Sequence, residues 1–228
     1  MLICTKISLV VALAALAGCD TVMHGNAGQG DGSHHAMAAA SGVARVDGGK
    51  GALEHRIVPL RPMSGDVELL YGDPEVAGEP FVMRIRELPG AIVPPHSHPV
   101  DEHITVVQGT WHFALGSEFK PEALQELKAG GYAFAPKGSW MFGFSPDGAI
   151  VQVHGVGPFR IHWHGGLHTL DDADAKSVFH FSKGARVVSQ ARRGEILQGY
   201  ASGKIIQYEI EGPSGERFMA NEHELRLQ

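Results

Sequence analysis

The sequence predicts an all-β protein with two β-rich parts. Short runs that are rich in β-branched and aromatic residues, such as VELLYG, FVMRIREL and GYAFAP, alternate with turn signals such as GDPEVAGEP and SPDG. Short strands at this spacing are typical of a β-sandwich or a β-barrel. Glycine is abundant, with 30 of 228 residues, while aromatic residues make up only 7%. This balance favours many turns over long helices.

The composition is that of a globular protein without a nucleic-acid partner. Hydrophobic residues make up 43% of the chain and charged residues 19%, which is ordinary for a folded domain. The formal net charge is -6, so no basic surface is available for a phosphate backbone. The sequence also contains no glycine-rich phosphate loop and no G-x-S-x-G nucleophile elbow.

The first nineteen residues have the pattern of a lipoprotein signal peptide. Lys6 precedes an apolar run at 7–17, which is too short to span a membrane and has the length of a signal h-region. The run leads into the tetrapeptide LAGC, which resembles the bacterial lipobox, in which the cysteine is lipidated and becomes the mature N-terminus. The resemblance implies a lipid on Cys19 and an exported protein anchored to a bacterial membrane, on the periplasmic side or at the cell surface. Cys4, the other cysteine of the chain, would leave with the signal peptide 1–19, so we expect no disulfide.

The rest of the chain divides into a linker and two β units. Residues 20–52 are rich in Gly, Ala, Ser and His without an apolar period, which predicts a flexible linker. We expect the main β domain at 53–170 and a small β-barrel-like domain at 180–228, with hairpin turns at the Ser-Gly pairs 202–203 and 214–215. The second unit weakly resembles SH3-like barrels. Because so small a unit is marginal alone, we expect it to dock on the main domain.

A cluster of metal-type side chains lies between Gly90 and Gly109. His96 and His98 are two residues apart on a predicted strand, so both side chains point to the same side. Glu102 follows after a short kinked step and can enter from that side as well. Neutral imidazole and carboxylate are the ligands that a divalent metal takes at about 2.0–2.2 Å. The pattern therefore predicts a metal site on the wall of a β-barrel.

The spacing of this cluster resembles the first motif of the cupin family: glycine, five residues, His-x-His, three residues, glutamate, six residues, glycine. Gly130, followed after five residues by Pro136-x-Gly138, resembles the first half of the second cupin motif. The resemblance implies a double-stranded β-helix, or jelly roll, for the main domain. It also implies one divalent metal ion, which is iron, manganese, zinc, nickel or copper in different cupins. Resembling cupins often form dimers, so a homodimer is an open expectation.

The sequence departs from the cupin pattern at the fourth ligand. Where the family has a histidine in the second motif, this chain has Met141. A thioether is a poor ligand for hard metals and a fair one for copper(I). Three alternatives follow: a three-ligand site with more open positions, a soft metal bound by Met141, or Met141 packing in the barrel. We favour a three-ligand set of His96, His98 and Glu102.

A predicted hairpin offers a replacement for the missing histidine. With a turn at 145–148, Met141 would lie opposite Gln152, and His154 would lie diagonally beside Met141 on the same face. We therefore expect His154 as a fourth ligand or acid/base group, and Gln152 as a group that orients bound water or substrate. The alternative is that both residues point to solvent or to another subunit.

Two hypotheses for the function follow from the motif and the signal peptide. The first is an exported, metal-dependent cupin enzyme that acts on a small organic molecule by dioxygenase, lyase or isomerase chemistry. The second is a non-catalytic surface lipoprotein that binds a metal or another ligand. The methionines and histidines of the linker at 20–52 support copper for this second hypothesis.

Replacing Cys19 with serine is expected to release the protein from the membrane fraction, because the lipid is attached to the cysteine sulfur. Cell fractionation and sequencing of the mature N-terminus measure this. Cys4→Ser is the matched control, since it lies inside the signal peptide and should leave the protein on the membrane. A Cys19→Ser protein that stays on the membrane would contradict the lipoprotein assignment.

Overall fold

The computed structural model describes residues 44–45, 62–63, 65–190 and 192–228. The predicted signal peptide, and most of the predicted linker, lie outside these residues. The described elements are strands apart from three short 3₁₀ turns, so the all-β prediction is confirmed. Within the described ranges no helix has the length and hydropathy that crossing a bilayer requires. One of these 3₁₀ turns lies at Pro121–Ala123, and the strand that follows it begins at Gln125.

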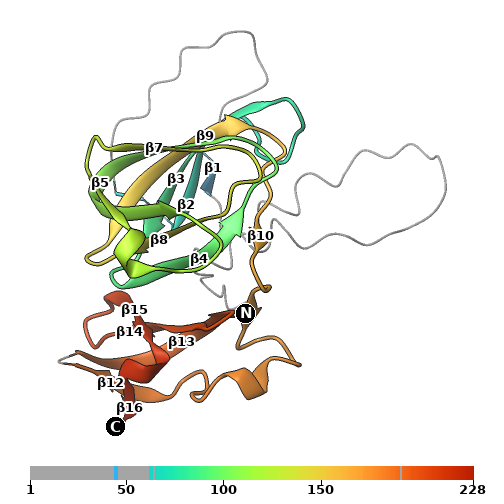
Figure 1. Cartoon of the computed structure of the whole chain (residues 1–228). Coiled ribbons are helices and arrows are strands. Elements are labelled where there is room, and N and C mark those ends of the chain that lie inside the picture. The colour runs from blue at the N-terminus through green and yellow to red at the C-terminus, as the bar shows by residue number, and fades with distance from the viewer. Residues whose placement is uncertain (1–43, 46–61, 64, 191) are drawn as a thin grey trace, which may run out of the picture.

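The first β unit is a ten-stranded sheet that curls into two facing halves (Figure 1). All of its strand pairs are antiparallel except that of β1 with β2. The first half consists of β1 (Ala44–Arg45), β2 (Val67–Tyr71), β3 (Pro80–Glu87), β9 (Ala149–Val156), the start of β5 (Glu102–Leu115) and β7 (Tyr132–Ala135). The second half consists of β10 (His162–Trp163), β4 (Ala91–Ser97), β8 (Met141–Ser145), the end of β5 and β6 (Gln125–Lys128).

Strand β5 passes from one half-sheet to the other at Gly109. Its first part pairs with β7 and β9, and its last part pairs with β6 and β8. Near the end of the first part, between Val106 and Gln108, the register against β9 shifts, and Gly109 has φ = 76°. A Cβ atom at Gly109 would collide with the carbonyl oxygen of Gly148, so only glycine fits this bend. The two half-sheets then face each other across one apolar core, which is the arrangement of a double-stranded β-helix.

Strands β8 and β9 do not form the predicted hairpin. They do not pair with each other, since β8 pairs with β4 and the end of β5, while β9 pairs with β3 and the start of β5. The turn after Ser145 therefore carries the chain from one half-sheet to the other. The predicted register of Met141 against Gln152 is wrong, because a turn signal marks a chain reversal but does not determine which strands then pair.

The second β unit is a six-stranded sheet that lies below the barrel in Figure 1. Its central strands follow one another through tight turns, and the predicted Ser-Gly turns are both present, with φ = 58° at Gly203 and 81° at Gly215. Tyr208 and Ile210 are fully buried at its centre. Its strands are β11 (His168–Thr169), β12 (Arg186–Ser189), β13 (Arg192–Ser202), β14 (Ile205–Glu211), β15 (Arg217–Asn221) and β16 (Leu225–Leu227).

The second unit docks on the base of the barrel, as expected. Leu88 and Ala91 from the barrel form an apolar cluster with Tyr200 and Met219 from the second unit. The amide of Met219 donates a hydrogen bond of 2.8 Å to the carbonyl oxygen of Pro89. Burial of these side chains against each other supplies a hydrophobic contribution to the junction, and the backbone hydrogen bond fixes its geometry.

Gln207 and Gly90 bring the two units into close contact. The Gln207 side chain accepts a hydrogen bond of 2.9 Å from the amide of Ile92 and donates one of 3.0 Å to the carbonyl oxygen of Gly90. Gly90 has φ = 82°, and a Cβ atom there would collide with the carbonyl oxygen of Met219. The glycine at the start of the metal-ligand motif is therefore also required by the contact with the second unit.

A buried charge cluster completes the junction. Arg217 on β15 contacts Asp66 of the barrel at 2.6 Å and Glu209 on β14 at 2.7 Å. Both carboxylates are buried, and the Arg217 side chain is only 15% exposed. The guanidinium is therefore the group that offsets two buried negative charges.

Arg217→Ala is expected to lower the free energy of unfolding by about 3 kcal/mol, because it leaves Asp66 and Glu209 buried without their cation. Urea unfolding at pH 7 measures the change. Arg193→Ala removes an exposed arginine of the same sheet and should change the stability by less than about 0.5 kcal/mol. Equal effects of the two substitutions would show that the cluster does not stabilise the fold.

Candidate metal centre

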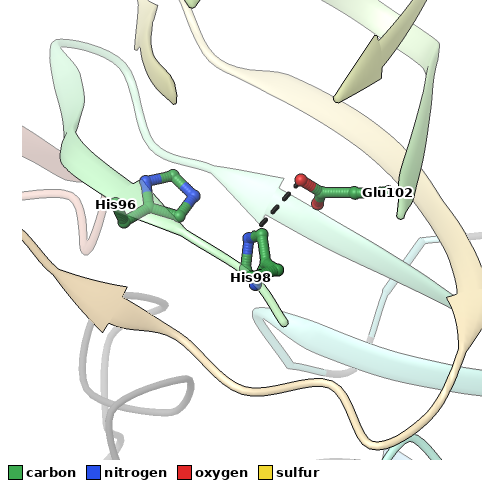
Figure 2. Close-up of side chains that lie close together, drawn as sticks. All are labelled: His96, His98 and Glu102. Atoms are coloured by element: carbon green, nitrogen blue, oxygen red, sulfur yellow. Dashed lines mark ion pairs between the residues drawn. The ribbon is translucent and has the colours of Figure 1, made fainter. Parts of the chain in front are cut away.

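The structure brings His96, His98 and Glu102 together at one end of the barrel interior (Figure 2). His96 lies near the end of β4, His98 follows this strand directly, and Glu102 begins β5. Their possible ligand atoms all lie within 4.8 Å of one another, and His98 Nε2 is 3.4 Å from Glu102 Oε2. All three side chains are buried. Because the connection between β4 and β5 is short, these three residues, which are close in the sequence, also lie close together in space.

Backbone carbonyl groups determine which nitrogen of each imidazole faces the cluster. His96 Nδ1 lies 2.8 Å from the carbonyl oxygen of Pro94, and His98 Nδ1 lies 2.7 Å from the carbonyl oxygen of Arg160. A carbonyl oxygen only accepts, so each Nδ1 carries the proton and donates it. Each Nε2 then keeps its lone pair, which is the arrangement of metal-ligating histidines in proteins.

Burial sets the protonation of the three groups. It lowers the pKa of His96 to about 4, and burial together with the neighbouring His96 lowers the pKa of His98 to about 3. Burial also raises the pKa of Glu102 to about 8. Both histidines are therefore neutral at neutral pH, as metal ligands must be.

The unpartnered atoms of the cluster fit a metal ion. Within the described residues, His98 Nε2 and Glu102 Oε2 are buried and have no hydrogen-bond partner. Buried polar atoms of native proteins normally have a partner. Two imidazole nitrogens and one carboxylate oxygen are a donor set that a divalent first-row metal accepts. The residues present thus match the group that the sequence predicts.

Aromatic side chains hold the two imidazole rings. The His98 ring stacks on Phe159, with ring centroids 4.1 Å apart and an interplanar angle of 16°. The His96 ring packs against Trp163 at 5.2 Å. Phe159 belongs to the segment between β9 and β10, which the sequence analysis did not include in the site.

The cluster opens into a cavity inside the barrel. The space that the centre of a water molecule can reach is about 50 Å³, which is room for several waters or one small organic molecule. The walls are mainly apolar and include Ile85, Val93, Ile104, Phe113, Val151 and Val153. Apart from the candidate metal ligands His96, His98 and Glu102, the polar residues on the walls are Glu87, Trp111 and Trp163.

Met141 lies directly opposite His96 in the pairing of β4 with β8. Its side chain is 2% exposed and lines the cavity together with the metal cluster. Met141 therefore lies at the end of the cavity that carries His96. Packing against the site and soft-metal ligation are both compatible with this position.

The predicted roles of His154 and Gln152 are wrong. On β9 the residues that line the cavity are Val151 and Val153, so Gln152 and His154 point to the opposite face of the strand. The His154 ring instead stacks on His103 of β5, with centroids 4.7 Å apart and an interplanar angle of 8°. The error comes from the assumed hairpin, because the side-chain face of β9 is set by its pairing with β3 and β5.

Sequence reasoning missed Glu87, the last residue of β3. Its side chain lines the cavity and is 5% exposed. Burial, and then the negative charge of Asp66, raise its pKa to about 8. The run PFVMRIRE alternates between the two faces, and Phe81, Met83 and Ile85 are its buried apolar members. Continuing the same alternation by two residues would have placed Glu87 inside the barrel.

Together, the fold and the cluster define a double-stranded β-helix protein with a candidate three-residue metal centre. No family model matches the sequence, and none of the curated proteins matches it either. Solved structures do share similarity with parts of the chain. One is an uncharacterized conserved protein with a double-stranded beta-helix domain from Klebsiella pneumoniae, 24% identical, with a TM-score of 0.37, covering 48% of this chain and 96% of that protein.

Two further solved structures match parts of the chain, and one of them is a lyase by its name. KdgF from Halomonas sp. is 20% identical with a TM-score of 0.33, and the match covers 40% of this chain and 77% of that protein. The DMSP lyase DddQ from Ruegeria pomeroyi is 20% identical with a TM-score of 0.31, and the match covers 36% of this chain and 40% of that enzyme. Each match covers less than half of this chain, whose fold is defined by its own strand order.

Glu87→Gln is expected to stabilise the protein increasingly as the pH rises from 6 to 8. Folding raises the pKa of Glu87 from 4.5 to about 8, so the folded state binds this proton more tightly than the unfolded state. The stabilisation from that proton is complete below pH 4.5 and is lost as the pH rises through 8. Glutamine stays neutral and avoids the loss. Thermal unfolding at pH 6, 7, 8 and 9 measures the difference in Tm from wild type.

Glu122→Gln is the control, because Glu122 is exposed. Its difference in Tm from wild type should not change across this pH range. A constant difference for Glu87→Gln as well would show that the Glu87 carboxyl titrates normally.

Proposed function

We propose that this chain binds one divalent metal ion through His96, His98 and Glu102, and that it is an enzyme acting on a small organic molecule in the adjoining cavity. The observation that carries this proposal is the convergence of two imidazole Nε2 atoms and a carboxylate in one buried cluster. Structural zinc sites use four protein ligands, whereas catalytic sites use three and leave a position open. Three ligands beside a cavity therefore support a catalytic rather than a structural ion.

The protein's own residues prepare the site for chemistry. A metal ion bound there would supply Lewis acidity toward a substrate oxygen or a bound water. The carbonyl groups of Pro94 and Arg160 hold the imidazoles in the ligating tautomer. The apolar walls keep bulk water away and so strengthen electrostatic interactions inside. Glu87 holds a proton at its carboxyl group in the same cavity, because its pKa is about 8.

The reaction type within this proposal is that of a dioxygenase, a lyase or an isomerase. All three types use a metal with an open position and a small enclosed substrate site, and the fold does not decide among them. The metal is iron, manganese, zinc, nickel or copper. Copper would gain a further ligand from Met141, which lies opposite His96.

The proposal extends to the place where the protein acts. We propose that it is exported and held on a bacterial membrane by a lipid on Cys19, which rests on the LAGC pattern of the sequence. A small-molecule substrate outside the cytoplasm would then reach the barrel directly. A homodimer is part of the proposal only through the cupin resemblance.

The double variant His96→Ala/His98→Ala is expected to lose stoichiometric zinc binding, with an affinity at least about a hundredfold lower, because it removes both nitrogen ligands. Isothermal titration calorimetry measures the affinity, and circular dichroism checks that the barrel stays folded. The matched control is His103→Ala/His154→Ala, which removes two histidines from the outer face of the barrel. The control should keep a full equivalent of zinc. If the first variant also keeps a full equivalent, the metal centre is not at this cluster.

A further inference from the structure

Two tryptophan side chains of the cavity lining carry buried N–H donors. Trp111 and Trp163 both line it, and Trp111 is only 5% exposed. Within the described residues, the Nε1 atom of each ring is buried and has no hydrogen-bond partner from the protein. An indole N–H can donate but cannot accept, and a buried tryptophan N–H usually finds an acceptor. Two rings of the cavity lining therefore carry an N–H group that has no acceptor within the described residues.

The surrounding structure fixes both rings. The Trp111 ring lies on Gly143 of β8, where a Cβ atom would collide with it. Trp163 lies on β10 directly opposite His96, and its ring packs against the His96 ring. Neither donor can turn away without disturbing β8 or a metal ligand.

The two donors lie at different depths in the barrel. Trp163 pairs with His96, and His96 pairs with Met141, across the neighbouring strands β10, β4 and β8. Trp163 therefore lies at the end of the barrel that carries the candidate metal ligands. The Trp111 ring touches Gly143, two residues further along β8. Two residues of a strand span roughly 7 Å. Trp163 is thus beside the cluster of His96, His98 and Glu102, and the Trp111 ring is one layer deeper.

The remaining walls limit the chemistry of a ligand. They are mainly apolar, so a ligand must present carbon over most of its surface. Glu87 does not repel an anionic ligand at neutral pH, because burial raises its pKa to about 8 and the carboxyl group is then mostly protonated. In this state Glu87 is a further donor. Apart from the metal cluster, the polar groups that face the cavity all favour hydrogen-bond acceptors.

We propose that the cavity binds a short carbonyl or carboxylate compound whose oxygen atoms accept hydrogen bonds from the indole N–H groups of Trp111 and Trp163. The carbon chain of this compound packs against the apolar walls. A cavity of about 50 Å³ for water centres restricts it to a few non-hydrogen atoms. This inference rests on the proposed function, since it names the class of ligand that the metal-bearing cavity takes.

The indole N–H signals in the ¹H–¹⁵N spectrum of the zinc-loaded protein test this directly. The chain has three tryptophans, and the third, Trp140, does not line the cavity; its ring packs on His164. Butanoate and butanone are expected to shift the signals of Trp111 and Trp163 but not that of Trp140. Butylammonium has the same chain length but no acceptor atom, and it should shift none of them. Equal shifts with butylammonium, or equal shifts of Trp140, would overturn the inference.

Variants separate the donors from the packing of the rings. Trp111→Phe and Trp163→Phe remove the N–H but keep an aromatic ring, and each should weaken butanoate binding about tenfold or more. Trp140→Phe is the control and should leave the affinity unchanged. Gly143→Ala keeps the N–H of Trp111 but displaces its ring, so it should also weaken binding. Unchanged affinity in both Trp111→Phe and Trp163→Phe would overturn the inference.

Zinc titration of the same samples distinguishes the two proposals. If zinc does not bind but butanoate still shifts the two indole signals, the proposed metal-dependent function is wrong and the ligand class stands. If zinc binds and neither butanoate nor butanone shifts the signals, the ligand class is wrong and the metal centre stands.

Discussion

The bend of β5 at Gly109 is the constraint on which the barrel depends. This single strand joins both half-sheets, and only glycine fits the bend because φ is 76° and the backbone of Gly148 lies against it. The residues before the bend supply Glu102 to the metal cluster, and those after it supply Trp111 to the cavity wall. If the strand ran straight, the two half-sheets would not face each other. The enclosed cavity, and with it the low pKa values of the buried histidines, follows from this one change of direction.

Burial makes the cluster of His96, His98 and Glu102 energetically unfavourable without a metal ion and favourable with one. Burying polar atoms without partners costs free energy, and His98 Nε2 and Glu102 Oε2 are two such atoms within the described residues. The protein itself provides hydrogen-bond partners for some of these polar atoms, because Nδ1 of His96 and Nδ1 of His98 each donate to a backbone carbonyl oxygen. What is left are the atoms that a metal ion would bind. Burial disfavours the charged form of Glu102 and so raises its pKa. A metal ion bound beside it would supply the positive charge that favours the carboxylate.

The sequence predicted the local part of the site and failed on the part that depends on strand pairing. His96, His98 and Glu102 could be found because they lie within seven residues of one another, so the alternation along a strand and one short connection bring them together. Gln152 and His154 could not be placed, because their face depends on which strands β9 pairs with, and the turn at 145–148 does not determine that. The all-β class and the Ser-Gly turns of the second unit were predicted correctly, since both rest on local chain reversal.

Glu87, on the cavity wall, is linked to the second β unit through the charge of Asp66. The negative charge of Asp66 raises the pKa of Glu87, and Asp66 in turn is bound by Arg217 of the second unit at 2.6 Å. A positive charge beside Asp66 weakens the field that Asp66 exerts on Glu87. The second unit thus supplies the cation that pairs with Asp66, in addition to covering the base of the barrel through Met219 and Gln207. Because Arg217 lies on β15 and is itself held by Glu209, the charge that faces Asp66 is fixed by the fold of the second unit. The two β units are therefore coupled electrostatically as well as by packing.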